Sequence, residues 1–146
     1  MRTETAAEAD LHLQLRPGSD AALAFTLLHV LRRDGLDQRA GELGARLRRG
    51  LEGLAGRHDA VADVRGRGLL LGMELADDPA SGGADRLGAA VTARCMELGL
   101  HMNIVQLPGM GGIFRIAPPL TASDTEIDRG LAILDEALTT VGEQVA

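Results

Sequence analysis

The chain is 146 residues long, 45% of its residues are apolar, and its formal net charge is −6. A chain of this length is long enough to bury one core, so a single core-bearing domain is expected. Because the arginines are scattered among acidic residues, the composition indicates neither a nucleic-acid partner nor a membrane partner.

The beginning of the sequence lacks the features of a secreted or membrane-spanning protein. Its start, MRTETAAEAD, is acidic, whereas a signal peptide begins with basic residues. The single Cys95 cannot form an internal disulfide, which fits a reducing cytoplasm. Residues 21–31 form the longest apolar run, which is shorter than the roughly 20 residues that a membrane helix requires. The run therefore predicts a helix of a soluble protein.

Residues 36–75 change from a helical pattern to a strand pattern. Apolar residues recur at steps of three and four from 36 to 57, which predicts a surface helix with one buried stripe: Leu36, Ala40, Leu43, Leu47, Leu51 and Leu54. From 61 to 75 the apolar runs are short and are broken by Gly66, Gly68 and Gly72. This pattern predicts two short strands or one bent strand, with residues 69–71 at its core.

The second half of the chain alternates between helical and extended patterns. Residues 77–85 are rich in turn formers and predict a loop. A second helix is expected to follow and to end at Gly99, because apolar residues recur at helical spacing: Leu87, Val91, Cys95 and Leu98. Alternation over 100–105 predicts a half-buried strand. The glycine-rich loop PGMGG, 108–112, leads to a strand over 113–117, and Pro118 and Pro119 end that strand.

The last element begins with a recognisable helix start. Ser123 and Glu126 have the spacing of a capping box, and an apolar stripe follows to the end of the helix: Ile127, Leu131, Leu134, Leu138 and Val141. The order of elements is then α, α, β, β, α, β, β, α. This order predicts an α/β fold in which one small sheet is covered by helices.

Arg115 is the candidate binding residue. In an alternating strand, Phe114 and Ile116 point to one face and Arg115 points to the other. The planar guanidinium of arginine can bind a carboxylate through two parallel hydrogen bonds. Periodicity alone favours the alternative, a solvent-facing or structurally paired arginine.

Other candidate chemistries find little support in the sequence. Arg65 and Arg67 could form an anion site with glycine amides, but two solvent-facing arginines are the simpler interpretation. The glycines match no phosphate-binding spacing, and the four histidines, His12, His29, His58 and His101, lie too far apart in sequence to predict a metal site.

No catalytic constellation is predicted either. Cys95 lies on an apolar stripe and is expected to be a buried, inert thiol. Ser19 lies in a turn-like PGSD segment, and Ser123 is explained by capping. All 15 positively charged residues are arginines, so the sequence contains no lysine that could form a Schiff base.

The segments DVRGRGLLLGMEL and MNIVQLPGMGGIFRIAPPLTAS carry a resemblance to a known family. The stretch from about residue 33 to Val141 resembles the small C-terminal domain of class III aminotransferases of fold type I, and 2,2-dialkylglycine decarboxylase in particular. Residues 33–146 are therefore expected to form this domain. The resemblance implies that Arg115 binds the substrate's α-carboxylate. It therefore favours a binding role for Arg115 over the structural role that periodicity alone favours. It also implies a pyridoxal 5'-phosphate cofactor and an amino-acid substrate. Because the chain has no lysine, we expect no covalent cofactor attachment and no activity from the chain alone.

Residues 1–32 are expected to be a divergent N-terminal segment with a helix, and residues 11–31 are similar to a segment of molybdopterin-dependent oxidoreductases. Three hypotheses follow. The chain is a fragment of an aminotransferase or decarboxylase, a non-catalytic interaction module that docks onto a separate large domain, or a fusion relic joined to a molybdopterin oxidoreductase fragment. A homo-oligomer is a further expected form of assembly.

Overall fold

The computed structural model describes residues 16–77, 79, 82–105 and 112–145. It divides the chain into two compact units, Met1–Gly35 and Leu36–Ala146. In the first unit, helix α2 spans Asp20–Arg33 and confirms the helix predicted at 21–31. Asp20 lies in its first turn and two arginines lie in its last turn, so these charges complement the helix dipole.

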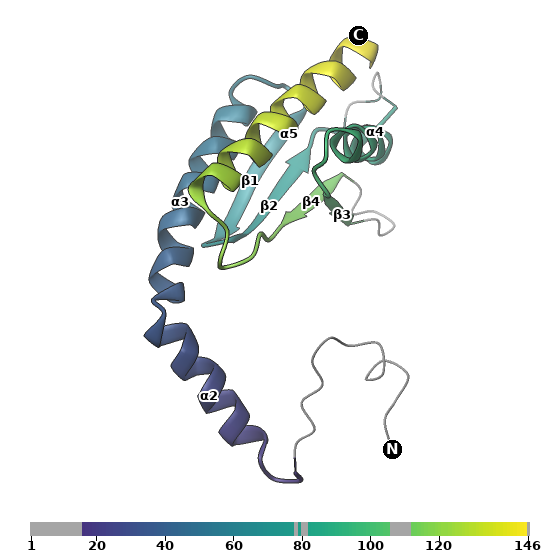
Figure 1. Cartoon of the computed structure of the whole chain (residues 1–146). Helices are drawn as coiled ribbons and strands as arrows, with labels where there is room; N and C mark the ends of the chain where they lie inside the picture. The colour runs from purple at the N-terminus through teal and green to yellow at the C-terminus, as the bar shows by residue number, and fades with distance from the viewer. Residues whose placement is uncertain (1–15, 78, 80–81, 106–111, 146) are drawn as a thin grey trace. The chain divides into compact units, whose positions relative to one another are not determined.

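Three helices of the second unit present apolar stripes to one core. They are α3, Leu36–Ala55, α4, Ala84–Glu97, and α5, Asp124–Val145 (Figure 1). Helix α3 ends before the predicted residue 57 because the amide of Arg57 turns back to the Leu54 carbonyl at 2.9 Å. Helix α4 already includes Asp85, which was expected in a loop, and the Ala84 amide at its start donates to the Asp77 carboxylate at 3.1 Å.

The strands form an antiparallel four-stranded sheet in the order β1-β2-β4-β3. Strands β1, Val61–Arg67, and β2, Leu70–Leu75, confirm that the glycine-broken segment forms two strands. Strand β3 spans only Asn103–Val105, since the Leu100 amide is still bonded to the Cys95 carbonyl at the end of α4, at 2.8 Å. Strand β4, Ile113–Ile116, ends one residue earlier than predicted, ahead of the two prolines.

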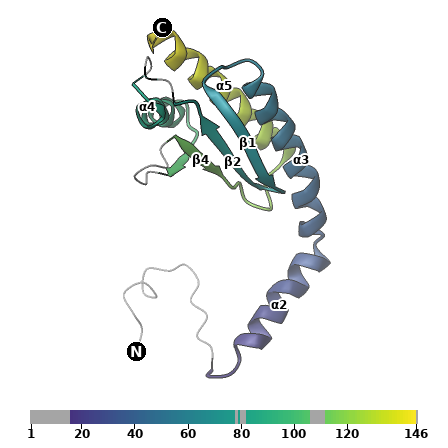
Figure 2. The same cartoon turned by 180° about the vertical axis from the view of Figure 1, so that it is seen from behind.

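The core of the second unit lies between the sheet and the helices. Figure 2 shows β1, β2 and β4 in front of α3 and α5, so these two helices cover one face of the sheet. Helix α4 packs against α5, β2 and β3. The largest fully buried side chains come from the sheet and from both α3 and α4: Phe114, Leu51, Leu54, Leu71, Met73, Val91 and Cys95. The fold is therefore the expected small α/β sheet with helices.

One close contact fixes how α3 lies on the β1–β2 turn. A Cβ atom placed on Gly44 of α3 would lie only 2.3 Å from the backbone of Gly68, which itself has φ +55°. Only a glycine at position 44 lets the helix approach the turn this closely. No helix among the described residues is long and apolar enough to cross a membrane.

Candidate functional site

Arg115 lies on β4 and points away from the helices. Its neighbour Phe114 is fully buried in the core, whereas Arg115 is exposed. In the sheet, Arg115 is paired with Gly72 on β2 and with Asn103 on β3. Cross-strand partners share a face, so these positions belong to the face of the sheet that α3 and α5 leave uncovered, here called the open face.

The start of β4 is held against both α4 and β2. Gly112 has φ +78°, and a Cβ atom there would lie 2.5 Å from the Cβ of Ala84. Its carbonyl accepts a 2.9 Å hydrogen bond from the Leu75 amide. The rest of the predicted PGMGG loop lies outside the described residues. Gly112 therefore fixes the point at which the strand enters the sheet.

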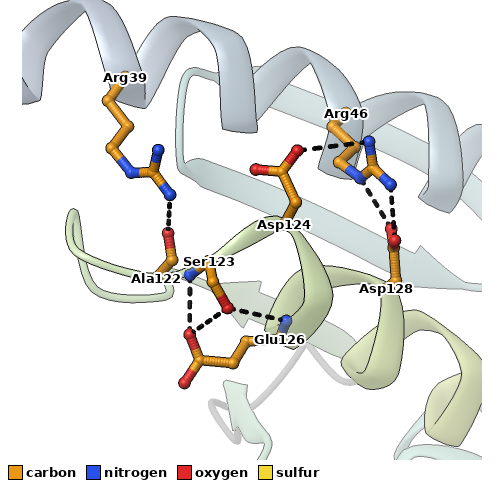
Figure 3. Close-up of polar contacts among 7 residues, drawn as sticks. All are labelled: Arg39, Arg46, Ala122, Ser123, Asp124, Glu126 and Asp128. Carbon is orange, nitrogen blue, oxygen red and sulfur yellow. Dashed lines mark hydrogen bonds and ion pairs between the residues drawn. The ribbon is translucent and has the colours of Figure 1, made fainter.

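The chain after β4 is held against α3. The Ala122 amide donates to the Pro119 carbonyl at 3.0 Å, which closes a turn after the two prolines. The Ala122 carbonyl accepts a 2.7 Å hydrogen bond from Nη2 of Arg39 on α3 (Figure 3). Arg115 is thus carried by a short strand whose two ends are both tied to helices, which limits how far its backbone can shift.

The predicted capping box begins α5 directly after this turn. The Ser123 amide donates to Glu126 at 2.7 Å, and the Glu126 amide donates back to Oγ of Ser123 at 3.2 Å (Figure 3). The amide and the hydroxyl of Ser123 both donate hydrogen bonds to the Glu126 carboxylate, and these bonds lower the pKa of Glu126. Arg46 of α3 also holds Asp128 through two hydrogen bonds of 2.7 and 2.6 Å, which lower the pKa of that carboxyl.

The other arginines of the open face differ from Arg115 in their surroundings. Arg65 contacts Asp63 at 2.7 Å and also contacts Glu74, and these hydrogen bonds raise its pKa. Arg67 is exposed, so the simpler interpretation of this pair as solvent-facing arginines agrees with the structure. Among the described residues, no carboxylate lies within ion-pair distance of Arg115. Its guanidinium is therefore available to bind a carboxylate from outside this part of the chain.

The other candidate catalytic and metal-binding residues lie apart from Arg115 along the sequence. In the structure, they have contacts of their own. Cys95 is buried, and burial raises the pKa of its thiol to about 11, which keeps it protonated. Ser19 donates to the Arg16 carbonyl at 2.7 Å. His58 contacts Asp135 of α5 at 2.6 Å, whereas His12 lies outside the described residues. Within the part of the chain that is described, no three possible metal ligands gather.

Sequence reasoning missed one residue of this site. Gly72 appeared only as a break in an apolar run, but the strand register places it directly beside Arg115. The available signal was an isolated glycine inside a strand, which often marks a close approach by a ligand or another backbone. The partner strand could not be known without the sheet order.

The fold resembles that of solved transaminases of fold type I. One transaminase obtained by ancestral reconstruction is 32% identical, with a TM-score of 0.72, over 86% of this chain and 28% of that chain. A transaminase from the marine bacterium Virgibacillus is 27% identical, with a TM-score of 0.73, over 86% of this chain and 29% of that one. The fold is thus that of a small transaminase domain.

The sequence comparisons identify the family. The class III aminotransferase family model matches residues 18–138, so the chain belongs to the class III aminotransferases. An uncharacterized aminotransferase of Schizosaccharomyces pombe is 46% identical over 82% of this chain and 27% of its own length. The acetylornithine aminotransferase of Mycobacterium tuberculosis is 38% identical over 81% and 26%, respectively. The chain therefore spans about a quarter of the length of these relatives.

Two consequences concern the cofactor and the N-terminal segment. The family uses pyridoxal 5'-phosphate, but the residues of this chain do not fit its covalent attachment because none of them is a lysine. The family match begins at residue 18 and therefore includes α2. The resemblance of residues 11–31 to molybdopterin oxidoreductases, the domain boundary at 32/33 and the cytoplasmic location stay predictions.

Proposed function

We propose that this chain is the substrate-carboxylate-binding portion of a class III aminotransferase, with Arg115 as the ligand of the α-carboxylate. The observation that supports the proposal is the position of Arg115: an exposed guanidinium on a strand whose neighbouring side chain is fully buried. Two parallel hydrogen bonds from its fork would fix both the position and the plane of the carboxylate. Orientation of this kind is what a positioning arginine contributes to catalysis.

A more specific proposal concerns the reaction that the complete enzyme catalyses. The run MNIVQLPGMGGIFRIAPPL is similar to 2,2-dialkylglycine decarboxylase, and it supports decarboxylation and transamination of an amino acid by the complete enzyme. The cofactor of the family supplies the electron sink for such chemistry. The amine that holds the cofactor must come from residues other than those of this chain. The chain alone is therefore expected to be inactive.

A grafted enzyme tests the role of Arg115. Residues 18–138 replace the matching segment of the Mycobacterium tuberculosis acetylornithine aminotransferase, and KM for acetylornithine is measured. Arg115→Lys removes the bidentate fork and keeps the charge. We expect KM to rise about 10- to 100-fold, as the loss of a charge-assisted hydrogen bond of roughly 1.5–3 kcal/mol predicts.

Arg67→Lys is the matched control, because Arg67 is also an exposed arginine on the open face. It should leave KM unchanged. An unchanged KM in Arg115→Lys would refute the proposed carboxylate-binding role.

A second experiment uses the intact chain without a host. The Nε–H signal of Arg115 is followed by NMR while alanine is added, and Arg129, an exposed arginine on α5, is the internal reference. Saturable displacement of the Arg115 signal alone is the expected result. Equal, linear shifts of both signals would show nonspecific association and would contradict the proposal.

An interaction module that docks onto a separate large domain is the second candidate function. It is supported by the open face, where Leu70 is 60% exposed and Ile113 is only partly buried. Apolar surface of this kind commonly marks an interface. Sedimentation of the chain with the remaining portion of the host enzyme tests this candidate. Independent sedimentation at micromolar concentration would remove it.

A further inference from the structure

Gly72 lies in the middle of β2, between two arginines of the open face. It is paired with Arg65 on β1 and with Arg115 on β4. Side chains of directly opposite residues stand side by side, with Cβ atoms about 4.5–5.5 Å apart. A side chain at position 72 would therefore stand beside the stem of Arg115, whereas glycine leaves the surface flat.

The described part of the fold does not require glycine at this position. A Cβ atom on Gly72 would find its nearest neighbours at 3.8 to 4.0 Å, which is ordinary van der Waals contact, and its φ lies outside the left-handed region. Gly66 on β1 is different, since its φ is +130° and a Cβ atom there would lie 2.2 Å from the Leu70 carbonyl oxygen. A glycine inside a strand weakens that strand, so its presence at 72 calls for another reason.

The space above Gly72 is bounded on one side by a fixed side chain. Arg65 is held by Asp63 and Glu74, which belong to the same face of the sheet. Its Cγ lies 3.8 Å from the position that a Cβ of residue 72 would take. The other side is bounded by Arg115, whose guanidinium has no carboxylate partner among the described residues.

We propose that Gly72 is a specificity-determining residue of the Arg115 site, because its missing side chain leaves the room in which the substrate carboxylate lies. The inference rests on the proposed function and extends it from the charged group to the surface beside that group. A methyl group at position 72 would narrow this room, and a branched side chain would fill it. Stability should not fall, because strands favour β-branched residues and the Cβ atom fits.

The test compares binding with stability in the same variants. Gly72→Ala and Gly72→Val are made in the grafted enzyme and in the intact chain. We expect KM for acetylornithine to rise about fivefold for the alanine variant and further for the valine variant, with kcat changed less than twofold. The urea midpoint of the intact chain should stay the same or rise.

Gly130→Ala on α5 is the matched control, because a Cβ atom there also finds its nearest neighbour at 3.8 Å. It should leave KM unchanged. An unchanged KM in both Gly72 variants would overturn the inference. A lower urea midpoint in the intact chain would also overturn it, because glycine would then be required by the fold.

Failure of the inference can be told apart from failure of the proposed function. If Arg115→Lys leaves KM unchanged, the proposed function is wrong and the inference falls with it. If Arg115→Lys raises KM and the Gly72 variants do not, only the inference is wrong. The alanine titration of the intact chain gives an independent measurement: Gly72→Val should weaken the displacement of the Arg115 signal, and an undiminished displacement would refute the inference.

Discussion

Asp135 of α5 receives two contacts from residues that follow α3 in the sequence. Its carboxylate lies 2.6 Å from Nε2 of His58 and 2.8 Å from Nη2 of Arg57. The hydrogen bond from His58, followed by that from Arg57, lowers the pKa of Asp135. The side chain of Asp135 is 36% exposed, so solvent screens these interactions and their contribution to stability is modest.

The lowered pKa predicts how this contact depends on pH. A carboxyl group whose pKa is lower in the folded state stabilises the fold above its unfolded pKa of about 3.9, and this stability is lost as pH falls through the folded value. Asp135→Asn should therefore lower the free energy of unfolding by about 0.5–1 kcal/mol at pH 7. The difference from wild type should shrink below about pH 3. Urea unfolding at both pH values measures it, and an equal difference at both would contradict the assignment.

Two glycines of helix α3 have different surroundings. Gly41 is exposed and a Cβ atom there would meet nothing within 4 Å, whereas a Cβ atom on Gly44 would collide with the backbone of Gly68. Both glycines carry the same intrinsic cost in a helix. Alanine at position 41 and alanine at position 44 should therefore change the free energy of unfolding in opposite directions.

Gly41→Ala should raise the free energy of unfolding by about 0.5–1 kcal/mol, because alanine favours the helix. Gly44→Ala should lower it by about 1–3 kcal/mol, because the helix must move away from the turn. Urea unfolding of the two variants provides the measurement. A stabilising Gly44→Ala would show that the close approach is not required.

Most elements could be predicted from local patterns. The stripe of α3, the extended conformation of residues 61–75 and the capping box at Ser123 each depend on neighbours in sequence, and each was confirmed; of the two alternatives for 61–75, two strands rather than one bent strand formed. The element ends were less predictable, because they depend on specific bonds such as that from the Leu100 amide to Cys95. Such bonds leave no trace in apolar periodicity.

The candidate site was only partly predictable. Alternation correctly predicted that Arg115 and Phe114 point to opposite faces of a strand. The position of Gly72 beside Arg115 depends on the pairing of β2 with β4, which are separated in sequence by α4 and β3. The contact of His58 with Asp135 likewise joins distant segments. Strand register sets the first of these contacts and helix packing sets the second. Neither register nor helix packing leaves a signal in the local sequence.

Among the residues that the structure describes, the buried core lies in the second unit. Every buried hydrophobic residue of the described chain lies between Leu43 and Val141, and α2 contains no buried residue. Residues 36–146 therefore carry the interactions that stabilise the fold.

A truncated chain tests this division. Residues 36–146 should unfold cooperatively, with a free energy of unfolding within about 1 kcal/mol of that of the full chain, because no buried side chain lies among the described residues that truncation removes. Urea unfolding of the truncated and full chains makes the comparison. A loss of several kcal/mol would show that the first unit contributes to the core.

The contact between Gly44 and Gly68 also bears on the order of folding. It joins α3 to the turn of the hairpin formed by β1 and β2, and these three elements are consecutive in the sequence. Contacts between consecutive elements close short loops and form early, whereas β4 must wait for the longer loop that contains α4 and β3. We therefore expect the helix and its hairpin to form the folding nucleus, and the strand that bears Arg115 to join the sheet later.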